Sequence, residues 1–188
     1  LISGFTIQNG SAYEGGGIYG DYSSPTLNNL IIMGNTATNG GGIHLRFSHS
    51  KLNDVIIKNN SAAEGRGGGI WGYTDTLRLE YVTITGNTST MGGGMYFSFC
   101  FPTLINVTIA DNSASNISGI YYNNESSTNI LNSIIRNELY GSFDLSPHQT
   151  ANFSYSDILG GFEGEGNIDA DPVFTDPENG DYTLQAGS

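Results

Sequence analysis

The chain repeats itself about every 25 residues. A glycine-rich segment, GGGI or GGGM, occurs four times and has a weaker fifth copy. The apolar residues that follow the glycines are Ile18, Ile43, Ile70, Met95 and Ile120, with spacings of 25, 27, 25 and 25. A second segment keeps the same step and supplies Asn35, Asn60, Asn87 and Asn112. A fixed period in this range indicates a solenoid, in which each repeat forms one turn of a stack.

Each repeat is built from strand-forming residues. Short alternating segments rich in Ile, Val, Thr and Tyr are bounded by Gly, Asn and Ser, which is typical of strands and turns. No window carries the sustained i, i+3, i+4, i+7 spacing of an amphipathic helix. We therefore predict an all-β fold, a single-stranded parallel β-helix (solenoid) of about six to seven coils of about 25 residues. Residues 1–150 are expected to form the coils, beginning mid-coil, and residues 151–188 a last irregular coil and a closing segment that covers the open end.

Two positions of the repeat are predicted to be structural. The row Asn35, Asn60, Asn87 and Asn112 suits an inward turn, where side-chain amides bond to one another and to the backbone along the stack. The triple glycines permit positive φ and close backbone approach at a neighbouring corner. GGGIYG and GGGIWG match G-x-G-x-x-G, but a strand follows them and the motif recurs in every coil, so we do not expect a nucleotide site.

The strand after the glycines offers the candidates for function. If Ile43 and its equivalents point inward, alternation places the next residue outward and predicts that Leu45 and Phe47 point into the core. The first outward row is Tyr19, His44, Trp71, Tyr96 and Tyr121. The second is Asp21, Arg46, Tyr73, Ser98 and Asn123, and the third is Ser23, Ser48, Asp75, Cys100 and Glu125. One face is thus predicted to carry an exposed aromatic ladder flanked by polar groups.

This face has three interpretations. Aromatic rings stack on the apolar faces of sugars while polar neighbours bond to hydroxyls, so the ladder, with Tyr73 beside it, suits a linear polysaccharide. Alternatively, Asp21, His44, Arg46 and Asp75 form the catalytic group of a polysaccharide lyase or glycoside hydrolase, which needs clustered carboxylates or basic groups. The third interpretation is structural: cross-strand stacking, and an exposed ion pair that contributes little stability.

The C-terminal segment contains the candidate metal ligands. Its oxygen-rich side chains, of the kind that Ca²⁺ prefers, are Asp169, Asp171, Asp176, Glu178 and Asp181. They stand beside Pro, Gly and Asn, where turn formation also explains them, and their spacing fits no EF-hand. We expect no cofactor, with calcium at Asp169, Asp171, Asp176 and Asp181 as the alternative.

The charge balance narrows the class of partner. Lys and Arg total 6 against 18 Asp and Glu, which gives a formal net charge of −12. Such a surface repels nucleic acid and anionic membranes, and no apolar run approaches the roughly 18 residues that span a bilayer. The single cysteine, Cys100, excludes an intrachain disulfide. We therefore expect no nucleic-acid partner and no membrane insertion of this segment.

The repeats resemble those of a known group of proteins. The alternation of GGGI with IMGN, IKNN, ITGN and IADN is similar to the repeats of chlamydial-type polymorphic outer-membrane proteins, over residues 1 to about 137. Glycine stands where those repeats have alanine, and Ile where they have Phe before the asparagine; the glycines are Gly17, Gly42, Gly69 and Gly94. More generally, the chain resembles the right-handed parallel β-helix, the pectate-lyase-like scaffold, of secreted bacterial surface proteins.

The resemblance implies an extracellular location or the outer surface of a bacterium. Because Leu1 falls within a coil, we also expect further domains of the same chain upstream, and others downstream. The scaffold carries enzymes and non-catalytic adhesins alike, so it does not decide the activity. Only the 27-residue coil, around residues 64–67, is extended, which leaves little room for loops that wall a catalytic groove. Our leading hypothesis is a non-catalytic module that binds polysaccharide or cell-surface glycan, or mediates adhesion, with a lyase or hydrolase and a purely structural stalk as alternatives.

Overall fold

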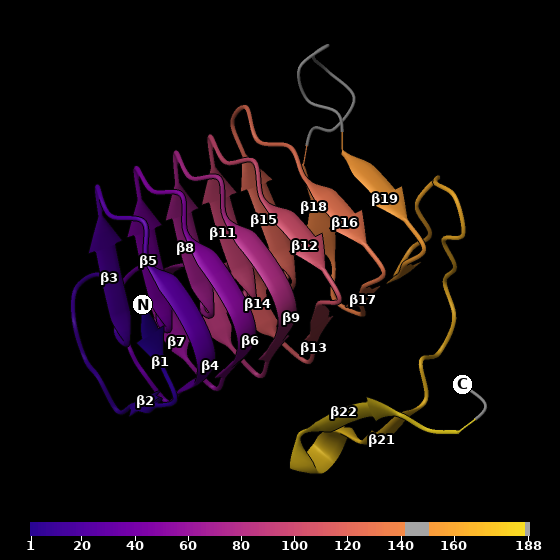
Figure 1. Cartoon of the computed structure of the whole chain (residues 1–188), viewed down its shortest axis with the longest axis horizontal. Coiled ribbons are helices and arrows are strands. Elements are labelled where there is room, and N and C mark those ends of the chain that lie inside the picture. Colours follow the sequence, from indigo (N-terminus) through magenta and orange to yellow (C-terminus); the bar gives the residue numbers. More distant parts are fainter. Residues whose placement is uncertain (142–150, 187–188) are drawn as a thin grey trace.

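The computed structural model describes residues 1–141 and 151–186. The chain winds into a rod of stacked coils, in which each strand pairs in parallel with the equivalent strand of the next coil (Figure 1). The longest path through one sheet crosses seven strands, in keeping with the six to seven coils expected. The prediction of an all-β parallel β-helix is therefore confirmed. The described residues contain no helix long and apolar enough to cross a membrane.

Each coil contributes to two large sheets and a flank. The eleven-stranded sheet consists of β1 (Ile2–Ser3), β2 (Thr6–Gln8), β4 (Thr26–Met33), β6 (Lys51–Lys58), β9 (Arg78–Thr85), β12 (Thr103–Ile105), β13 (Thr108–Ala110), β16 (Asn129–Leu131), β17 (Ile134–Ile135), β19 (Asn152–Ser154) and β20 (Asp157–Ile158). The six-stranded sheet consists of β3 (Ile18–Asp21), β5 (Ile43–Arg46), β8 (Ile70–Tyr73), β11 (Met95–Ser98), β15 (Ile120–Asn123) and β18 (Leu139–Tyr140). A three-stranded sheet consists of β7 (Ser61–Arg66), β10 (Thr88–Met91) and β14 (Ser113–Asn116).

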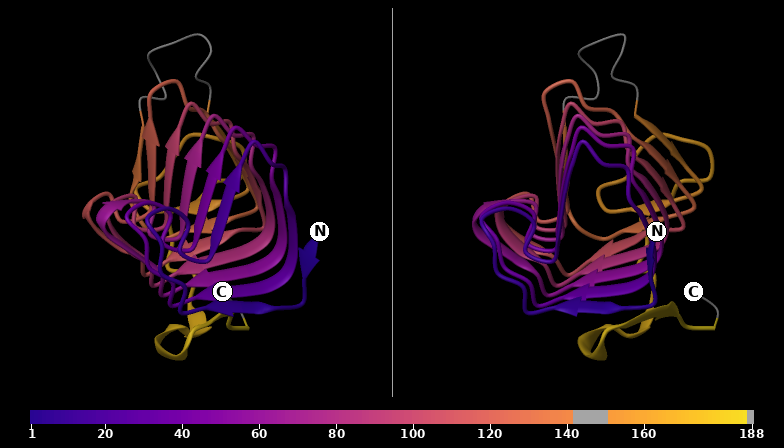
Figure 2. Two further views of the ribbon diagram at one scale, coloured as in Figure 1. Left: turned by 90° about the vertical axis from the view of Figure 1, so that its left-hand side faces the viewer. Right: turned by 60° about the vertical axis from the view of Figure 1, so that its left-hand side comes forward.

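The three-stranded sheet forms a ridge. It continues toward the N-terminus through the bridges Ser11–Thr36, Thr36–Ser61, Glu14–Asn39 and Asn39–Arg66. Figure 2 shows these loops projecting from the coil beside the foot of the six-stranded sheet. We call β7, β10 and β14, together with residues 11–14 and 36–39, the ridge. Because the ridge stands next to that sheet, the outer face of the sheet lies in a concave corner of the rod.

The interior is filled by the rows that the repeat predicts. Leu27, Leu30 and Ile32 and their equivalents in the next coils are buried, as are Ile43, Ile70, Met95 and Ile120 after the glycines. Parallel pairing joins Ile43 to Ile70 and Leu27 to Leu52, so each row runs along the axis in register. Stacked apolar rows of this kind give a continuous core that no single coil could bury alone.

Residues in the left-handed region mark the corners. One row follows the six-stranded sheet and consists of Tyr22, Phe47, Thr74, Phe99 and Asn124. Each of these residues turns the chain and interrupts the alternation of side chains that holds within a strand. At the ridge corner the requirement is for glycine: Gly40 has φ +65°, and a Cβ on Gly41 would lie 2.6 Å from the backbone of Ser61. The recurrent glycines are therefore a packing requirement of the corner.

The predicted asparagine ladder is present and fully bonded. The backbone N and Nδ2 of Asn60 both donate to Oδ1 of Asn87, at 2.9 and 3.0 Å, and Nδ2 also donates to the carbonyl of Ile32 at 2.9 Å. The same pattern joins Asn35 to Asn60 and Asn87 to Asn112. The ladder extends one rung beyond the prediction, because Asn112 donates to Asn137 at 3.1 and 3.0 Å.

The segment after β20 has two parts, which lie at different places on the rod. Its first part crosses the last coil: the amide of Ile158 donates to the carbonyl of Ile168, and Phe162 packs on Phe153 with ring centroids 4.7 Å apart. The second part is an antiparallel hairpin of β21 (Phe174–Asp176), the 3₁₀ turn η1 (Pro177–Asn179) and β22 (Asp181–Leu184). Figure 1 shows the hairpin alongside the rod, away from its open end.

The hairpin is tied to the side of the coils. The hydroxyl of Tyr182 donates to Oδ2 of Asp111 at 2.6 Å, across 71 residues of sequence. The hairpin therefore does not cover the open end, as was expected of the closing segment within residues 151–188; the described residues between β20 and the hairpin cross that end instead. The boundary expected at residue 150 falls among residues 142–150, which lie outside the described residues.

Candidate functional site

The predicted aromatic ladder is in register on the outer face of the six-stranded sheet. Parallel pairing places Tyr19 beside His44, His44 beside Trp71, Trp71 beside Tyr96 and Tyr96 beside Tyr121. Ring centroids are 4.1 Å apart for His44 and Trp71 and 5.3 Å apart for Tyr96 and Tyr121. The stack continues to Tyr140, 5.0 Å from Tyr121, a rung that the sequence analysis did not include.

The ladder is not uniformly exposed, contrary to the prediction. Tyr19 is 47% exposed, whereas His44 is 1% and Tyr96 2% exposed. The ridge accounts for the difference, since the guanidinium of Arg66 lies 5.2 Å above the ring of Tyr96. Trp71 and Tyr121 are half-buried. Tyr19, Trp71 and Tyr121 are therefore the rungs with exposed surface, and His44 and Tyr96 are covered rungs that pack beside them in the stack.

The second outward row contains a bidentate ion pair. Arg46 donates to the two carboxylate oxygens of Asp21 from Nε at 2.9 Å and from Nη2 at 2.7 Å. Arg46 also donates to the hydroxyl of Tyr19 at 3.4 Å. The hydrogen bonds from Arg46 lower the pKa of Asp21, and those to Asp21 raise the pKa of Arg46. Both groups are therefore charged at neutral pH, and they position each other on the face.

His44 is a neutral buried ring. Burial lowers the pKa of His44, and the charge of Glu14 on the ridge opposes that effect only in part. The ring lies between Tyr19 and Trp71, with centroids 5.3 and 4.1 Å away. At neutral pH the imidazole therefore contributes a flat ring to the ladder.

Asp75 does not lie on this face, and neither do Ser48 and Cys100 of the third predicted row. Thr74, with φ +50°, turns the chain before it, so that Asp75 is buried at the corner with 2% exposure. Its neighbours along the axis, Ser48 and Cys100, are also buried, and Cys100 belongs to the core. Burial raises the pKa of Asp75 to about 6 and that of Cys100 to about 12. The structure therefore brings Asp21, His44 and Arg46 together but leaves Asp75 apart.

A cleft of about 560 Å³ opens beside the ladder. Its lining residues come from four successive coils and from the ridge: Arg46, Phe47, Arg66, Trp71, Tyr73, Tyr96, Ser98, Phe99, Asn123 and Asn124. Half of these are aromatic, and the others offer guanidinium, amide and hydroxyl groups. Among the described residues, no carboxylate lines the cleft, although the chain as a whole carries a net charge of −12. Its volume is that of an ordinary small-ligand pocket.

A comparison with protein-family models agrees with this architecture. The model described as "Right handed beta helix region" matches residues 1–158. The chain belongs to this right-handed β-helix family. The match ends with β20, so the segment across the last coil and the hairpin lie beyond it. No curated protein and no solved structure matches the chain significantly.

Several residues of the β-helix cleft were missed or misplaced by the sequence analysis. Phe47 was expected in the core, but at φ +51° it stands at the corner and is 37% exposed. Phe99 occupies the same position two coils later, at φ +55°. Arg66 was missed because it follows the two-residue insertion of the 27-residue coil; pairing with Asn39 and Met91 returns it to register. A signal was available, since aromatic residues recur at 47 and 99 just after the strand.

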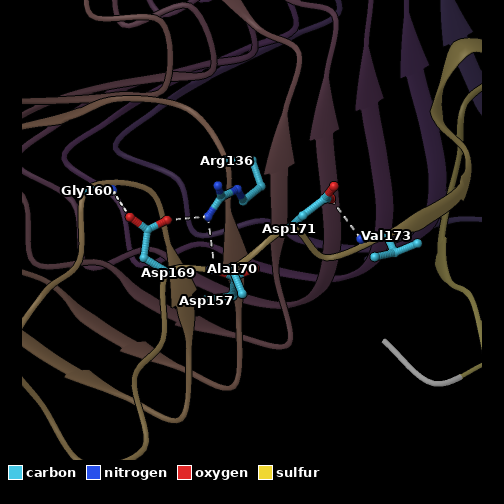
Figure 3. Close-up of polar contacts among 7 residues, drawn as sticks. All are labelled: Arg136, Asp157, Gly160, Asp169, Ala170, Asp171 and Val173. Carbon is cyan, nitrogen blue, oxygen red and sulfur yellow. Dashed lines mark hydrogen bonds and ion pairs between the residues drawn. The ribbon is translucent and has the colours of Figure 1, made fainter.

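The four aspartates proposed for calcium make separate contacts, and Figure 3 shows those of two of them, Asp169 and Asp171. Asp169 accepts from Arg136 at 2.8 Å and from the amide of Gly160 at 3.1 Å, and Asp171 accepts from the amide of Val173. Asp176 caps η1 and Asp181 accepts from Thr183. Among residues 1–141 and 151–186, no three acidic, His or Cys side chains gather as a metal site would require. These carboxylates form turns and, with Arg136 and Asp157, hold the closing segment to the coils.

Proposed function

We propose that this β-helix is a non-catalytic module that binds polysaccharide through the cleft and the aromatic ladder beside it. The observation that carries the proposal is the cleft itself, where five aromatic side chains stand next to arginine, amide and hydroxyl groups. Sugar rings offer apolar faces to aromatic rings and hydroxyls to polar groups, so they match both kinds of lining. Lining from four coils, about 14 Å along the axis at the usual strand spacing, suits an extended chain of sugars.

The arrangement of charged groups supports binding over catalysis. A glycosidase needs two carboxylates across the scissile bond, and of the four residues weighed for catalysis Asp21 is the one carboxylate on this face. A lyase needs a base, but Arg46 is held protonated by Asp21, which raises its pKa. His44 is buried and is not among the lining residues of the cleft.

The cellular setting is part of the same proposal. The resemblance of the repeats to those of secreted bacterial surface proteins supports a location on the outer surface of a bacterium. There the module would present the cleft to cell-surface or environmental glycans and mediate adhesion. The cleft takes its lining from four successive coils, which gives a ligand a path along the rod.

The test is a glycan array with neutral and acidic polysaccharides, probed with the wild-type chain and with Trp71→Ala. Trp71 lines the cleft and stands at the centre of the ladder. We expect affinity to fall at least about tenfold in Trp71→Ala, equivalent to about 1.4 kcal/mol. Tyr13→Ala is the matched control, because Tyr13 is 74% exposed on the ridge and is not a lining residue.

Three results would overturn the proposal. If the wild-type chain binds no member of the array, the spacer alternative replaces it. If Trp71→Ala and Tyr13→Ala bind as the wild type does, another surface is responsible. Release of reducing ends or unsaturated uronates from the array polysaccharides would instead establish the lyase or hydrolase alternative.

A further inference from the structure

Arg66 differs from the other arginines of the chain. Arg46, Arg78 and Arg136 each form an ion pair with one or two carboxylates. Among the described residues, Arg66 forms no ion pair, and no carboxylate lines the cleft to which it belongs. Resting on the proposed function, we propose that the polysaccharide in the cleft carries a negatively charged substituent and that Arg66 binds it.

The ridge holds Arg66 in place. Its backbone amide donates to Oδ1 of Asn39 at 3.3 Å, and its carbonyl accepts from the amide of Gly40 at 2.9 Å. The guanidinium lies 5.2 Å above the ring of Tyr96, yet the residue as a whole is exposed. A guanidinium carries five N–H donors in a planar fork that matches the oxygens of a carboxylate or an ester anion. Arg66 therefore offers the cleft both a charge and directed donors.

The second arginine of the lining does not offer the same charge. Arg46 is bound through Nε and Nη2 to both carboxylate oxygens of Asp21, so its charge is largely compensated. The cleft thus has one uncompensated positive charge, on a chain whose net charge is −12. A single cation in such a field suits one anionic group and not a row of them.

Glu14 limits how closely the charges of a ligand can be spaced. The ridge pairs Glu14 with Asn39 and Asn39 with Arg66, so Glu14 stands two coils from Arg66, about 9.6 Å at the usual strand spacing. It lies near enough to His44 and Arg46 to act on both electrostatically. One sugar of an extended chain is about as long as the coil spacing, about 5 Å. A polymer charged at every sugar would therefore bring an anion against Glu14, and the geometry points to a neutral backbone with isolated anionic substituents.

The test uses matched oligosaccharides that differ only in charge. The probes are β-1,4-linked hexasaccharides of glucose, mannose and galactose, each in a neutral form, with one internal sugar oxidised at C6 to the carboxylate, with one C6 sulfate instead, and with every sugar oxidised. Calorimetry at low salt measures their binding to the wild type, Arg66→Gln, Arg66→Lys and Arg78→Gln. Arg78→Gln is the matched control, because it removes the same charge from the large sheet and Arg78 does not line the cleft.

We expect the wild type to bind a singly charged form at least about tenfold more tightly than the neutral form of the same backbone. The ratio between the carboxylate and the sulfate then assigns the substituent. The fully oxidised form should bind more weakly than the singly charged one, and the preference for a single charge should shrink as salt is added. Arg66→Gln should bring the ratio of charged to neutral binding to about one, whereas Arg66→Lys and Arg78→Gln should keep most of it.

Two outcomes overturn this inference and leave the proposed function standing. In the first, the wild type binds the neutral hexasaccharides but shows no preference for a single charge, a measurement that needs no variant to fold. In the second, Arg66→Gln weakens neutral and charged forms equally, which would make Arg66 a cover for Tyr96 and not a ligand for the substituent. If the wild type binds none of the forms, the proposed function fails and this inference fails with it.

Discussion

The asparagine ladder and the aromatic ladder run along the same rod, yet they are built differently. Every rung from Asn35 to Asn112 is the same residue, buried, with its amide group bonded to the next coil and to a backbone carbonyl. The rungs of the aromatic ladder are Tyr, His, Trp, Tyr and Tyr, and their exposure ranges from 1% to 47%. One ladder repeats its chemistry and the other varies it.

The difference follows from what each position must satisfy. An inward corner leaves backbone groups without water, so one side chain of the right length and with both donor and acceptor must supply their partners in every coil. An outward strand position has its backbone already paired within the sheet, and several flat side chains stack equally well there. Uniform rungs therefore indicate a requirement of the fold, and varied outward rungs are free to serve contacts.

Removing one rung of the asparagine ladder should have the largest effect. Asn87→Ala leaves the backbone amide of Asn60 without its acceptor in a buried site, and it also removes one of the two bonds of Asn60 Nδ2 and the bond to the carbonyl of Ile57. At about 1–3 kcal/mol for each buried unpaired group, we expect a loss of about 3 kcal/mol or more in the free energy of unfolding. Urea denaturation of the wild type and the variant measures this loss.

The control for that variant is Asn53→Ala. Asn53 also belongs to an asparagine pair between coils, donating to Asn28 at 2.8 Å, but on the partly exposed outer face of the large sheet. Water can replace that bond, so the loss should stay below about 1 kcal/mol. Equal losses in the two variants would show that burial does not make the asparagine ladder more important for stability than an exposed asparagine pair.

The repeat and both ladders could be predicted from the sequence because they depend only on its period of about 25 residues. The rows of Leu27 and Ile43 keep one step along the chain, and a parallel stack turns that step into a column. The prediction failed where it assumed that inward and outward side chains keep alternating across a corner. Thr74 adopts positive φ, which sends Asp75 inward, and the same corner brings Phe47 outward. The sequence names no φ value for Thr or Phe, so these two errors have one cause.

The position of Arg66 could not be predicted from the sequence, for a different reason. The two extra residues of its coil form an irregularity between Ala62 and Arg66, and only pairing with Met91 shows where the register resumes. The hairpin was likewise unpredictable, since the bond from Tyr182 to Asp111 joins segments outside and inside the repeat. Contacts that do not recur in each coil cannot be predicted from the sequence repeat.

Asp75 is a buried polar residue whose replacement should stabilise the fold. It is buried between Ser48 and Cys100, and desolvation of its carboxylate outweighs the opposing effects of the Ser50 and Thr76 backbone groups and of His49. Burial raises its pKa from 3.8 to about 6, so the native state binds this proton more tightly than the unfolded chain does. Stability from this group is therefore greatest below about pH 4 and falls as the pH rises through about 6.

We expect Asp75→Ser, which copies Ser48 of the preceding coil, to raise the free energy of unfolding at pH 8 by up to about 3 kcal/mol. At pH 3.5 most of that gain should disappear, because the wild-type carboxyl is then protonated in both states. Urea midpoints at the two pH values measure the difference. A gain that is the same at both would mean that packing, and not the charge, distinguishes the two residues.

Of these substitutions, one at the exposed corner after the six-stranded sheet should change the free energy of unfolding least. Phe47→Asn replaces a bulky residue at φ +51° with one suited to that region, a relief of about 1 kcal/mol or more. It also removes the ring contacts with Tyr22 at 4.7 Å and Tyr73 at 5.4 Å, which contribute about 0.5–1.5 kcal/mol each. These terms oppose each other, so the urea midpoint should correspond to a change within about 1 kcal/mol. A loss as large as that of Asn87→Ala would place Phe47 among the residues that the fold requires, and the aromatic corner could no longer be assigned to contact with a ligand.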